Sequence, residues 1–94
     1  MTADLEEKTD RYGTLLTDAL GQATIVPPAG SPLRAAAEEC LEMAESYRDD
    51  GEHFRAADDP VNALAAFSYG YGWLDAGVRI GLFDVPDESS LFTT

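Results

Sequence analysis

His53 is the only histidine in the chain, and the carboxylates before it give it the spacing of half a metal site. Asp50 and Asp49 precede it by three and four residues, so these side chains can share one face of a helix. A carboxylate three residues before a histidine is half of the metal site found in some helical bundles. The other half would have to come from a facing helix, where Asp75 is the only candidate, and one histidine supplies too few ligands. The sequence therefore favours a solvated helix face at His53, and no metal site is expected.

Arg48 and His53 form a second candidate, because four residues separate them. This spacing resembles the ribonuclease motif of HEPN-type helical domains, and a cation for the phosphate with an imidazole for proton transfer would be sensible chemistry. With five arginines in 94 residues, such a spacing before a lone histidine also arises readily by chance. The acidic residues around the pair oppose an RNA substrate. An RNA-processing endoribonuclease using Arg48 and His53 is kept as the alternative function.

Asp75 is the one carboxylate inside a long apolar segment, and Arg79 follows it by four residues. Buried carboxylates are normally paired, so the favoured interpretation is an ion pair at the edge of a helical bundle. The alternative is a small-ligand pocket in which Asp75 is the polar anchor and tyrosines are its hydrogen-bonding neighbours. The tyrosines in question are Tyr47, Tyr69 and Tyr71.

Other catalytic patterns are missing from the sequence. There is no Ser/His/Asp arrangement, no phosphate-binding loop and no glycine-rich nucleotide fingerprint. Cys40 is the only cysteine, which excludes an intrachain disulfide and a cysteine-rich zinc site. It lies on an apolar stripe with small neighbours, which favours a buried core thiol. We therefore expect a non-enzymatic protein without a cofactor.

Three helices must position these residues, and the first is predicted at about residues 3–20. Its apolar positions recur at alternating steps of four and three, the period of an amphipathic helix. These positions are Leu5, Thr9, Tyr12, Leu16, Ala19 and Ala23. Gly21 is expected to end the helix. The segment 22–30, which contains prolines and glycine, is expected to be a loop packed by Ile25 and Val26.

The second helix is predicted to begin at Ser31-Pro32, with serine as the N-cap and proline in the first turn. Its apolar stripe is the most regular in the chain and repeats at steps of four and three over three heptads. The stripe consists of Leu33, Ala37, Cys40, Ala44, Tyr47, Gly51 and Phe54. Asp59 and Pro60 repeat the same start signal for a third helix. So short a connection predicts that the second and third helices form an antiparallel pair.

The third helix, at about residues 61–80, is apolar nearly all round, and such a helix is normally buried nearly all round. Two partner helices would hardly cover it. Gly70, Gly72 and Gly77 each cost about 1 kcal/mol relative to alanine in a helix interior, which suggests that a neighbour approaches closely. Gly81 is expected to end the helix.

The predicted fold class is all-α: an up-and-down three-helix bundle with long antiparallel second and third helices. Residues 1–83 are expected to form the bundle, and residues 84–94 a mobile C-terminal tail. No stretch approaches the ~18 consecutive apolar residues of a transmembrane helix, so no membrane partner is expected. The N-terminus is acidic, whereas a secretory signal would be basic and then apolar. A cytoplasmic location is therefore expected.

Charge separates this chain from an ordinary globular domain, because 18 acidic residues face only 6 basic ones and the net charge is −12. Self-repulsion of this size destabilises a compact state in dilute salt, whereas at ~1 M salt the Debye length falls to ~3 Å and the penalty largely disappears. The acidic surplus with a single lysine, Lys8, favours a halophilic protein in a salt-rich cytoplasm over a merely acidic one. No basic stripe is present to displace phosphate counterions, so nucleic acid is not an expected partner.

Two runs in the second and third predicted helices resemble a known family. The first is AESYRDDGEHF at residues 44–54, and the second is DPVNALAAFSYGYGWLDAG at residues 59–77. They resemble the archaeal domain of unknown function 357 family over about residues 33–82, and the most specific part is the run from Tyr69 to Gly77. The resemblance implies an up-and-down three-helix bundle, but no activity and no catalytic residues. A weaker likeness to tetratricopeptide hairpins favours an interaction role.

Together these observations predict a non-enzymatic helical module that works through protein–protein contact, most simply as a homo-oligomer. A three-helix monomer would leave apolar surface on the third helix uncovered, and a self-complementary two-fold contact is the simplest cover. The predicted interface residues are Ala66, Tyr69, Gly70, Trp73, Gly77 and Ile80. In the competing account, chain segments fold back over the helix instead: the loop Ile25-Val26-Pro27-Pro28 and the residues Leu82, Phe83, Leu91 and Phe92.

Overall fold

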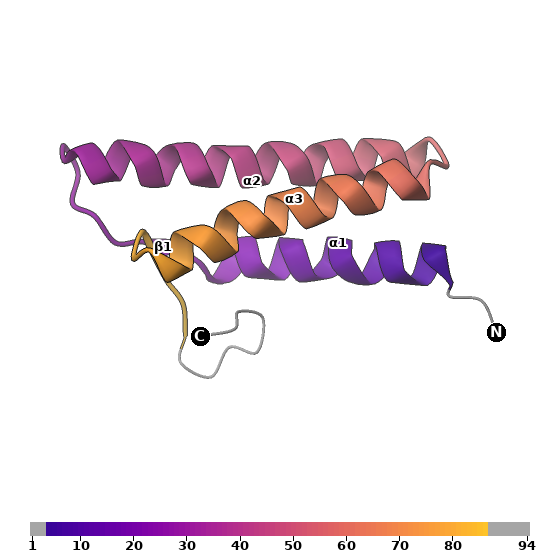
Figure 1. The fold of residues 1–94 in the computed structure, drawn as a ribbon, viewed down its shortest axis with the longest axis horizontal. Coiled ribbons are helices and arrows are strands. Elements are labelled where there is room, and N and C mark those ends of the chain that lie inside the picture. The colour runs from indigo at the N-terminus through magenta and orange to yellow at the C-terminus, as the bar shows by residue number, and fades with distance from the viewer. Residues whose placement is uncertain (1–3, 87–94) are drawn as a thin grey trace.

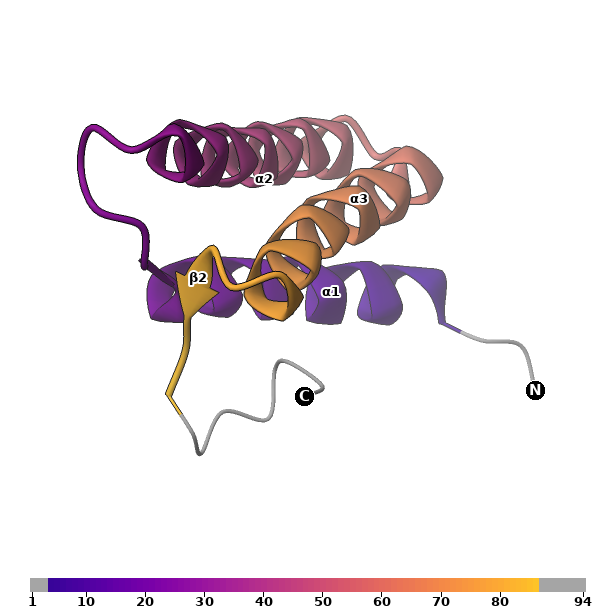
Figure 2. The same cartoon turned by 60° about the vertical axis from the view of Figure 1, so that its left-hand side comes forward.

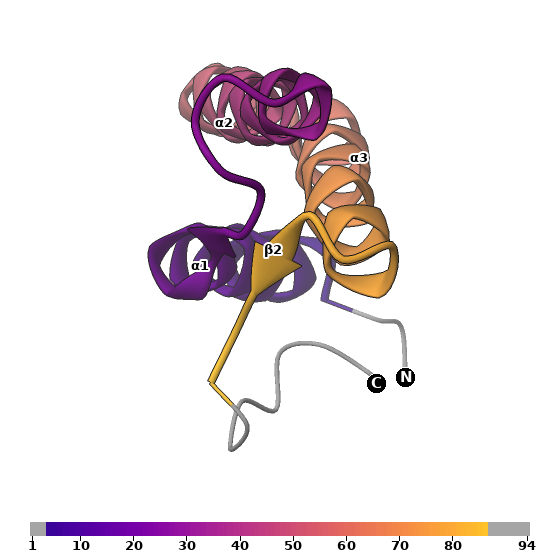
Figure 3. The same ribbon diagram turned by 90° about the vertical axis from the view of Figure 1, so that its left-hand side faces the viewer.

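The computed structural model describes residues 4–86 and contains three long helices that run up, down and up (Figure 1). α1 spans Leu5–Gln22, α2 spans Pro32–Ala56 and α3 spans Pro60–Arg79. α3 lies against both other helices and contacts α2 most extensively, whereas α1 and α2 touch each other less (Figure 3). The predicted all-α bundle with antiparallel second and third helices is confirmed.

Each helix begins where a short polar side chain caps it. The N-cap residues are Asp4, Ser31 and Asp59. In each case the side-chain oxygen accepts a hydrogen bond of 3.1–3.2 Å from the backbone N–H three residues later, which satisfies a donor that the helix leaves unpaired. Proline follows the cap in α2 and α3, where its fixed φ suits the first turn. The starts predicted at Ser31 and Asp59 are confirmed.

Residues in the left-handed region of backbone conformation end α2 and α3. The turn 57–59 joins these helices and includes Asp58 with φ 59°, a conformation that aspartate tolerates better than most residues. α3 ends in a Schellman motif, in which Gly81 has φ 87° and the N–H of Leu82 donates to the carbonyl of Gly77 at 2.8 Å. The end predicted at Gly81 is confirmed.

α1 continues beyond its predicted end. Gly21, expected to stop the helix, lies in its last turn, and the N–H of Ala23 still donates to the carbonyl of Ala19 at 3.1 Å. A glycine in the final turn keeps helical geometry at little cost, because helix ends are already frayed. The predicted end of the helix at residue 20 was therefore wrong by two residues.

A short antiparallel bridge fastens the α1–α2 connection to the segment after α3 (Figure 2). β1, Thr24–Ile25, pairs with β2, Phe83–Asp84. The N–H of Val26 extends the pairing with a 2.9 Å hydrogen bond to the carbonyl of Leu82. Ile25 packs against the core as predicted, but Val26 is 55% exposed. The bridge uses the backbone of Val26, and its side chain does not pack the loop.

The segment after α3 folds back on the end of the bundle. Leu82 and Phe83 are 4% and 3% exposed, so they cover part of the core. Asp84, assigned to the tail on sequence grounds, pairs with Thr24 in the bridge. Leu91 and Phe92, the other two residues of the competing account, lie outside the described residues.

The core is built around Phe67, whose ring is fully buried between α1 and α2. The ring takes the space that side chains would need at Gly13 of α1 and Gly51 of α2. A Cβ at Gly13 would lie 3.0 Å from the ring, and a Cβ at Gly51 would overlap it. The absence of side chains at these two glycines therefore allows a phenyl ring to lie between the helices.

Two glycines of α3 also make room for neighbours, and these belong to the same chain. A Cβ at Gly70 would lie 2.8 Å from a methyl carbon of Leu16, and a Cβ at Gly77 would overlap the ring of Phe83. The close approach predicted from these glycines is thus made within the bundle. Gly72 differs, because within the part of the chain that the structure describes nothing except its chain neighbours and the nearby helix backbone lies within 4 Å of the position its Cβ would take.

Charged side chains are concentrated outside α3. This helix carries only Asp75 and Arg79 as charged residues along its 20 positions. Even so, none of the helices within residues 4–86 combines the length and apolar character that crossing a membrane requires.

Candidate functional site

Arg48 and His53 both lie in the C-terminal half of α2, but the helix directs them apart. Five residues at 3.6 per turn place two side chains about 140° apart around the axis. Asp49 holds the Arg48 guanidinium, whose Nε and Nη2 donate to Oδ1 at 3.3 and 3.2 Å. The exposed His53 ring lies edge-on to Phe54, with ring centroids 6.1 Å apart. The structure therefore does not bring Arg48 and His53 together within one chain, and the endoribonuclease stays a prediction.

The carboxylates near His53 do not build a ligand set for a metal. Within residues 4–86, no three His, Cys, Asp or Glu side chains are placed to hold an ion together. Asp75, the facing carboxylate considered from the sequence, accepts a hydrogen bond from Arg79 on its own helix.

His53→Ala is expected to leave the bundle intact, because the side chain is exposed and its described contact is the edge of Phe54. Surface substitutions of this kind change the free energy of unfolding by less than about 0.5 kcal/mol. Urea unfolding followed by circular dichroism measures the change. Cleavage of a panel of RNAs by the wild type, lost in His53→Ala, would establish the endoribonuclease instead.

Asp75 and Arg79 form the ion pair that the sequence favoured. Nε of Arg79 donates to Oδ2 of Asp75 at 3.1 Å, and the two side chains are 51% and 29% exposed, respectively. Tyr71 lies one turn before Asp75 on the same side of α3. Burial, and secondarily the negative charge of Asp75, raises the pKa of Tyr71 above its ordinary value of 10.0.

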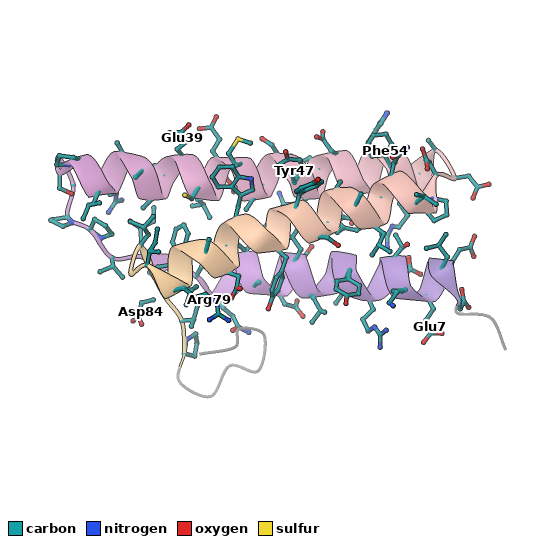
Figure 4. All side chains as sticks on the ribbon, viewed as in Figure 1. Glu7, Glu39, Tyr47, Phe54, Arg79 and Asp84 are labelled. Atoms are coloured by element: carbon teal, nitrogen blue, oxygen red, sulfur yellow. The ribbon has the colours of Figure 1, made fainter. Side chains whose placement is uncertain are left out.

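Tyr47 and Tyr69 lie on the other flank of α3. Their rings stack with centroids 5.6 Å apart and planes inclined by 27°. Figure 4 shows Tyr47 where α2 meets α3. Tyr69 and Tyr71 are two residues apart, so they point about 160° apart around the helix. The structure thus places Tyr71 near Asp75 and Tyr47 near Tyr69, but it does not gather them in one ligand pocket.

A pocket that the sequence did not reveal lies where the start of α1 meets the turn between α2 and α3. Its volume is about 120 Å³, and its lining residues are Glu6, Thr9, Asp10, Arg55, Asp58 and Pro60. Arg55 donates to Asp10 at 2.8 Å and to Glu52 at 2.9 Å, which links α2 to α1. These side chains are 41–64% exposed, so the pairs contribute about 1 kcal/mol at most.

Thr9, which lines this pocket, is the one buried polar side chain among residues 4–86, with 1% exposure. Its hydroxyl lies 2.7 Å from the carbonyl oxygen of Leu5 and 3.3 Å from that of Pro60, so it connects α1 to the start of α3. A threonine on the otherwise apolar seam of α1 was the available signal, because buried polar groups need hydrogen-bond partners.

An apolar stripe runs along the outward face of α3. The α3 stripe consists of six exposed residues, Val61, Ala65, Tyr69, Trp73, Ala76 and Ile80. Tyr69 and Ile80 are 65% and 70% exposed, and Trp73 is 38% exposed. Successive members are three or four residues apart, so they line one side of the helix. None of them carries a charge.

The residues predicted at an interface fall into two groups of three. Ala66, Gly70 and Gly77 are buried inside this chain's own bundle. The other three, Tyr69, Trp73 and Ile80, are exposed members of the α3 stripe. An interface on α3 stays a prediction, and the α3 stripe is the part of the helix that another molecule can reach.

α2 continues the apolar surface on one side of the α3 stripe. α2 and α3 are antiparallel, and Tyr69 of α3 stacks on Tyr47 of α2. A residue that follows Tyr69 therefore lies opposite the residue that precedes Tyr47 by the same number of positions. Four residues on, Trp73 comes opposite Met43, which is partly exposed. The apolar surface therefore extends from α3 across its boundary with α2.

Comparison with known proteins identifies a family for this chain. The sequence profile of the family described as "Protein of unknown function (DUF357)" matches residues 11–83, which include most of α1 and all of α2 and α3. No curated protein and no solved structure gives a significant match. The resemblance noted in the second and third helices is thereby confirmed, and the chain belongs to the DUF357 family of proteins of unknown function.

Proposed function

We propose that the chain is a non-enzymatic helical protein-interaction module and that the α3 stripe is its contact surface. The observation that carries this proposal is the exposure of Tyr69, Trp73 and Ile80 along a stripe of uncharged residues on one side of α3. Contiguous exposed apolar surface is uncommon on soluble monomers and marks interaction sites. Tyrosine and tryptophan are also among the residues that contribute most to binding energy at interfaces.

The form proposed is a homo-oligomer in a salt-rich cytoplasm. A chain of net charge −12 repels its own copies wherever carboxylates would meet. The α3 stripe carries no charge, so two copies can touch there without opposing their carboxylates. At ~1 M salt the remaining repulsion is screened beyond ~3 Å.

The extent of the apolar surface suits a dimer. A stable interface buries about 800 Å² on each partner, roughly an eighth of the 5917 Å² surface of this chain. A large aromatic side chain buries about 150–250 Å² when it is fully covered. Tyr69 and Trp73 are 65% and 38% exposed, so together they supply about 150–250 Å² of the area that each partner needs. Met43 and Tyr47 on the α2 side extend the surface toward that size.

In molar salt and at tens of micromolar, light scattering is expected to give the mass of a dimer for the wild type and of a monomer for Trp73→Glu. Burying an unpaired carboxylate at an apolar contact is strongly unfavourable. Leu5→Glu is the matched control, because Leu5 lies on α1 and is 37% exposed against 38% for Trp73. Tyr69→Glu repeats the test at a side chain that is 65% exposed.

Circular dichroism establishes that each variant is folded before its mass is compared. A wild-type monomer under these conditions would contradict the proposed homo-oligomer. A dimer that survives both Trp73→Glu and Tyr69→Glu would show that the contact surface lies elsewhere.

A further inference from the structure

The α3 stripe is symmetric in the type of its side chains: the same order of types occurs from its N-terminal end and from its C-terminal end. From either end the order is a β-branched residue, a small residue and an aromatic residue. In chain order the members are Val61, Ala65, Tyr69, Trp73, Ala76 and Ile80. These six residues form three matched pairs: the first with the last, the second with the fifth, and the two central residues. The midpoint of each pair falls at residue 70 to 71.

A two-fold contact requires this kind of symmetry, because each residue on one copy meets its counterpart on the other. An axis perpendicular to α3 at residue 70 to 71 makes the two helices antiparallel. It places Tyr69 opposite the partner's Trp73, with small residues opposite small residues on either side. Offset aromatic pairs with centroids 4.5–7 Å apart are favourable beyond the area that they bury.

Gly72 supplies a second, independent observation. Gly70 and Gly77 are explained by Leu16 and Phe83 of the same chain. Beside Gly72, by contrast, no atom of residues 4–86 other than its chain neighbours and the nearby backbone of α3 lies within 4 Å of the Cβ position. A glycine in a helix interior costs about 1 kcal/mol relative to alanine, and no contact within residues 4–86 accounts for that cost here. Gly72 lies next to the midpoint of the α3 stripe, where two antiparallel helices would approach most closely.

The charges at the two ends of α3 favour the same arrangement. Arg79, 51% exposed, lies at the C-terminal end, and Asp58 lies exposed just before the N-terminal end. Antiparallel helices bring Arg79 toward the partner's Asp58 at both ends of the contact, and they also oppose the helix dipoles. Parallel helices would set arginine against arginine and aspartate against aspartate.

We infer that two copies of this chain pair through their α3 stripes as antiparallel helices, with Tyr69 of each copy against Trp73 of the other. This arrangement rests on the proposed function, because it takes the α3 stripe to be the contact surface. The partner is thereby a second copy of the chain, joined across a two-fold axis beside Gly72.

Engineered cysteines test the pairing in the full chain with Cys40→Ala, so that no native thiol interferes. The variant Ala65→Cys/Ala76→Cys is expected to form a covalent dimer on mild oxidation, because position 65 of each copy lies opposite position 76 of the other. Ala65→Cys alone and Ala76→Cys alone are expected to stay uncross-linked. In each single variant, the cysteine of one copy and the same cysteine of the other copy lie about 16 Å apart along the antiparallel helices. A disulfide spans at most ~7 Å between Cα atoms.

The matched control is Glu38→Cys/Asp49→Cys, which carries two exposed cysteines at the same spacing on α2. Peptide mapping should assign the bond to positions 65 and 76, with about tenfold more covalent dimer in the Ala65→Cys/Ala76→Cys variant than in the control or either single variant.

Three other results would overturn the inference. Light scattering of the chain without cross-links tests separately whether the chain is an oligomer, which is the proposed function. A dimer that cross-links efficiently in the single variants has parallel helices, and a dimer that cross-links in none of these variants uses another arrangement. Both leave the interaction module standing. A chain that is monomeric, but becomes dimeric when residues 87–94 are deleted, would show that this segment occupies the stripe.

Discussion

Phe67→Ala is expected to lower the free energy of unfolding by about 3–5 kcal/mol, a large part of the stability of a domain this small. The Phe67 side chain is fully buried and lies between backbone segments of two other helices, at Gly13 and Gly51. No side chain at either glycine can turn to fill the cavity, so the contacts that the ring makes with α1 and with α2 are both lost. Urea unfolding monitored by circular dichroism measures the loss as a lower midpoint.

A double-mutant cycle with Gly51→Ala identifies the cause. In the wild type, the added methyl group would overlap the Phe67 ring, and we expect a net loss of about 1–2 kcal/mol after the gain in helix propensity. In the Phe67→Ala background the ring is gone, so the same change is expected to stabilise by about 1 kcal/mol. Gly21→Ala is the control, because nothing lies within 4 Å of its Cβ position. Additive effects of Gly51→Ala and Phe67→Ala would contradict the packing described here.

The elements of this fold could be predicted because their signals are local. Ser31-Pro32 and Asp59-Pro60 combine an N-cap with a proline in the first turn, and both helices begin there. Gly81 ends α3 because the Schellman motif needs a left-handed residue four residues after Gly77, whose carbonyl accepts from the N–H of Leu82. Gly21 is also a glycine near a helix end, but its backbone is not in the left-handed region, and α1 continues through it to Gln22.

The partners of the glycines could not be predicted, since they depend on how distant helices align. Gly51 was on the predicted stripe of the second helix, but nothing in its own segment shows that Phe67 fills its space. The sequence predicts Gly70 and Gly77 at a contact with another chain. The structure assigns Gly70 and Gly77 to intrachain contacts and leaves Gly72 exposed without one.

The grouping of candidate site residues was equally beyond the sequence. One residue along a helix turns the side chain by about 100°, so Tyr69 and Tyr71 fall on opposite flanks of α3 although they are near neighbours in sequence. The ion pair between Asp75 and Arg79 was predictable because a spacing of four residues determines it. The pocket beside Thr9 was not, because its lining residues come from α1, α2, the turn that follows α2 and the start of α3.

Thermal stability is expected to depend steeply on salt, with the unfolding midpoint rising by about 10 °C or more between dilute buffer and molar sodium chloride. Like charges three or four residues apart destabilise a helix by up to about 0.5 kcal/mol per pair, and five such acidic pairs on α2 cost about 2 kcal/mol in total. The pairs are 38/42, 39/42, 42/45, 45/49 and 49/52. For a domain of 60–100 residues, 1 kcal/mol shifts the midpoint by about 4–8 °C.

The ion pairs in the structure do not offset this repulsion. They are formed by four arginines, and each pair includes side chains exposed by 29–71%, where an ion pair contributes about 1 kcal/mol or less. Salt weakens these pairs as well, but repulsion dominates because acidic residues outnumber basic ones by 18 to 6. Screening therefore stabilises the folded chain on balance.

Glu42→Lys shows whether screening of acidic residues is the mechanism. Glu42 belongs to three of the five acidic pairs on α2, and it is exposed. Its reversal is expected to raise the midpoint in dilute buffer and to reduce the rise with salt. Leu33→Gln is the uncharged control, because Leu33 is 61% exposed on the same helix and its replacement leaves every acidic pair in place. A midpoint independent of salt would reject the halophilic interpretation, whereas a salt-dependent midpoint that Glu42→Lys leaves unchanged would place the repulsion outside α2.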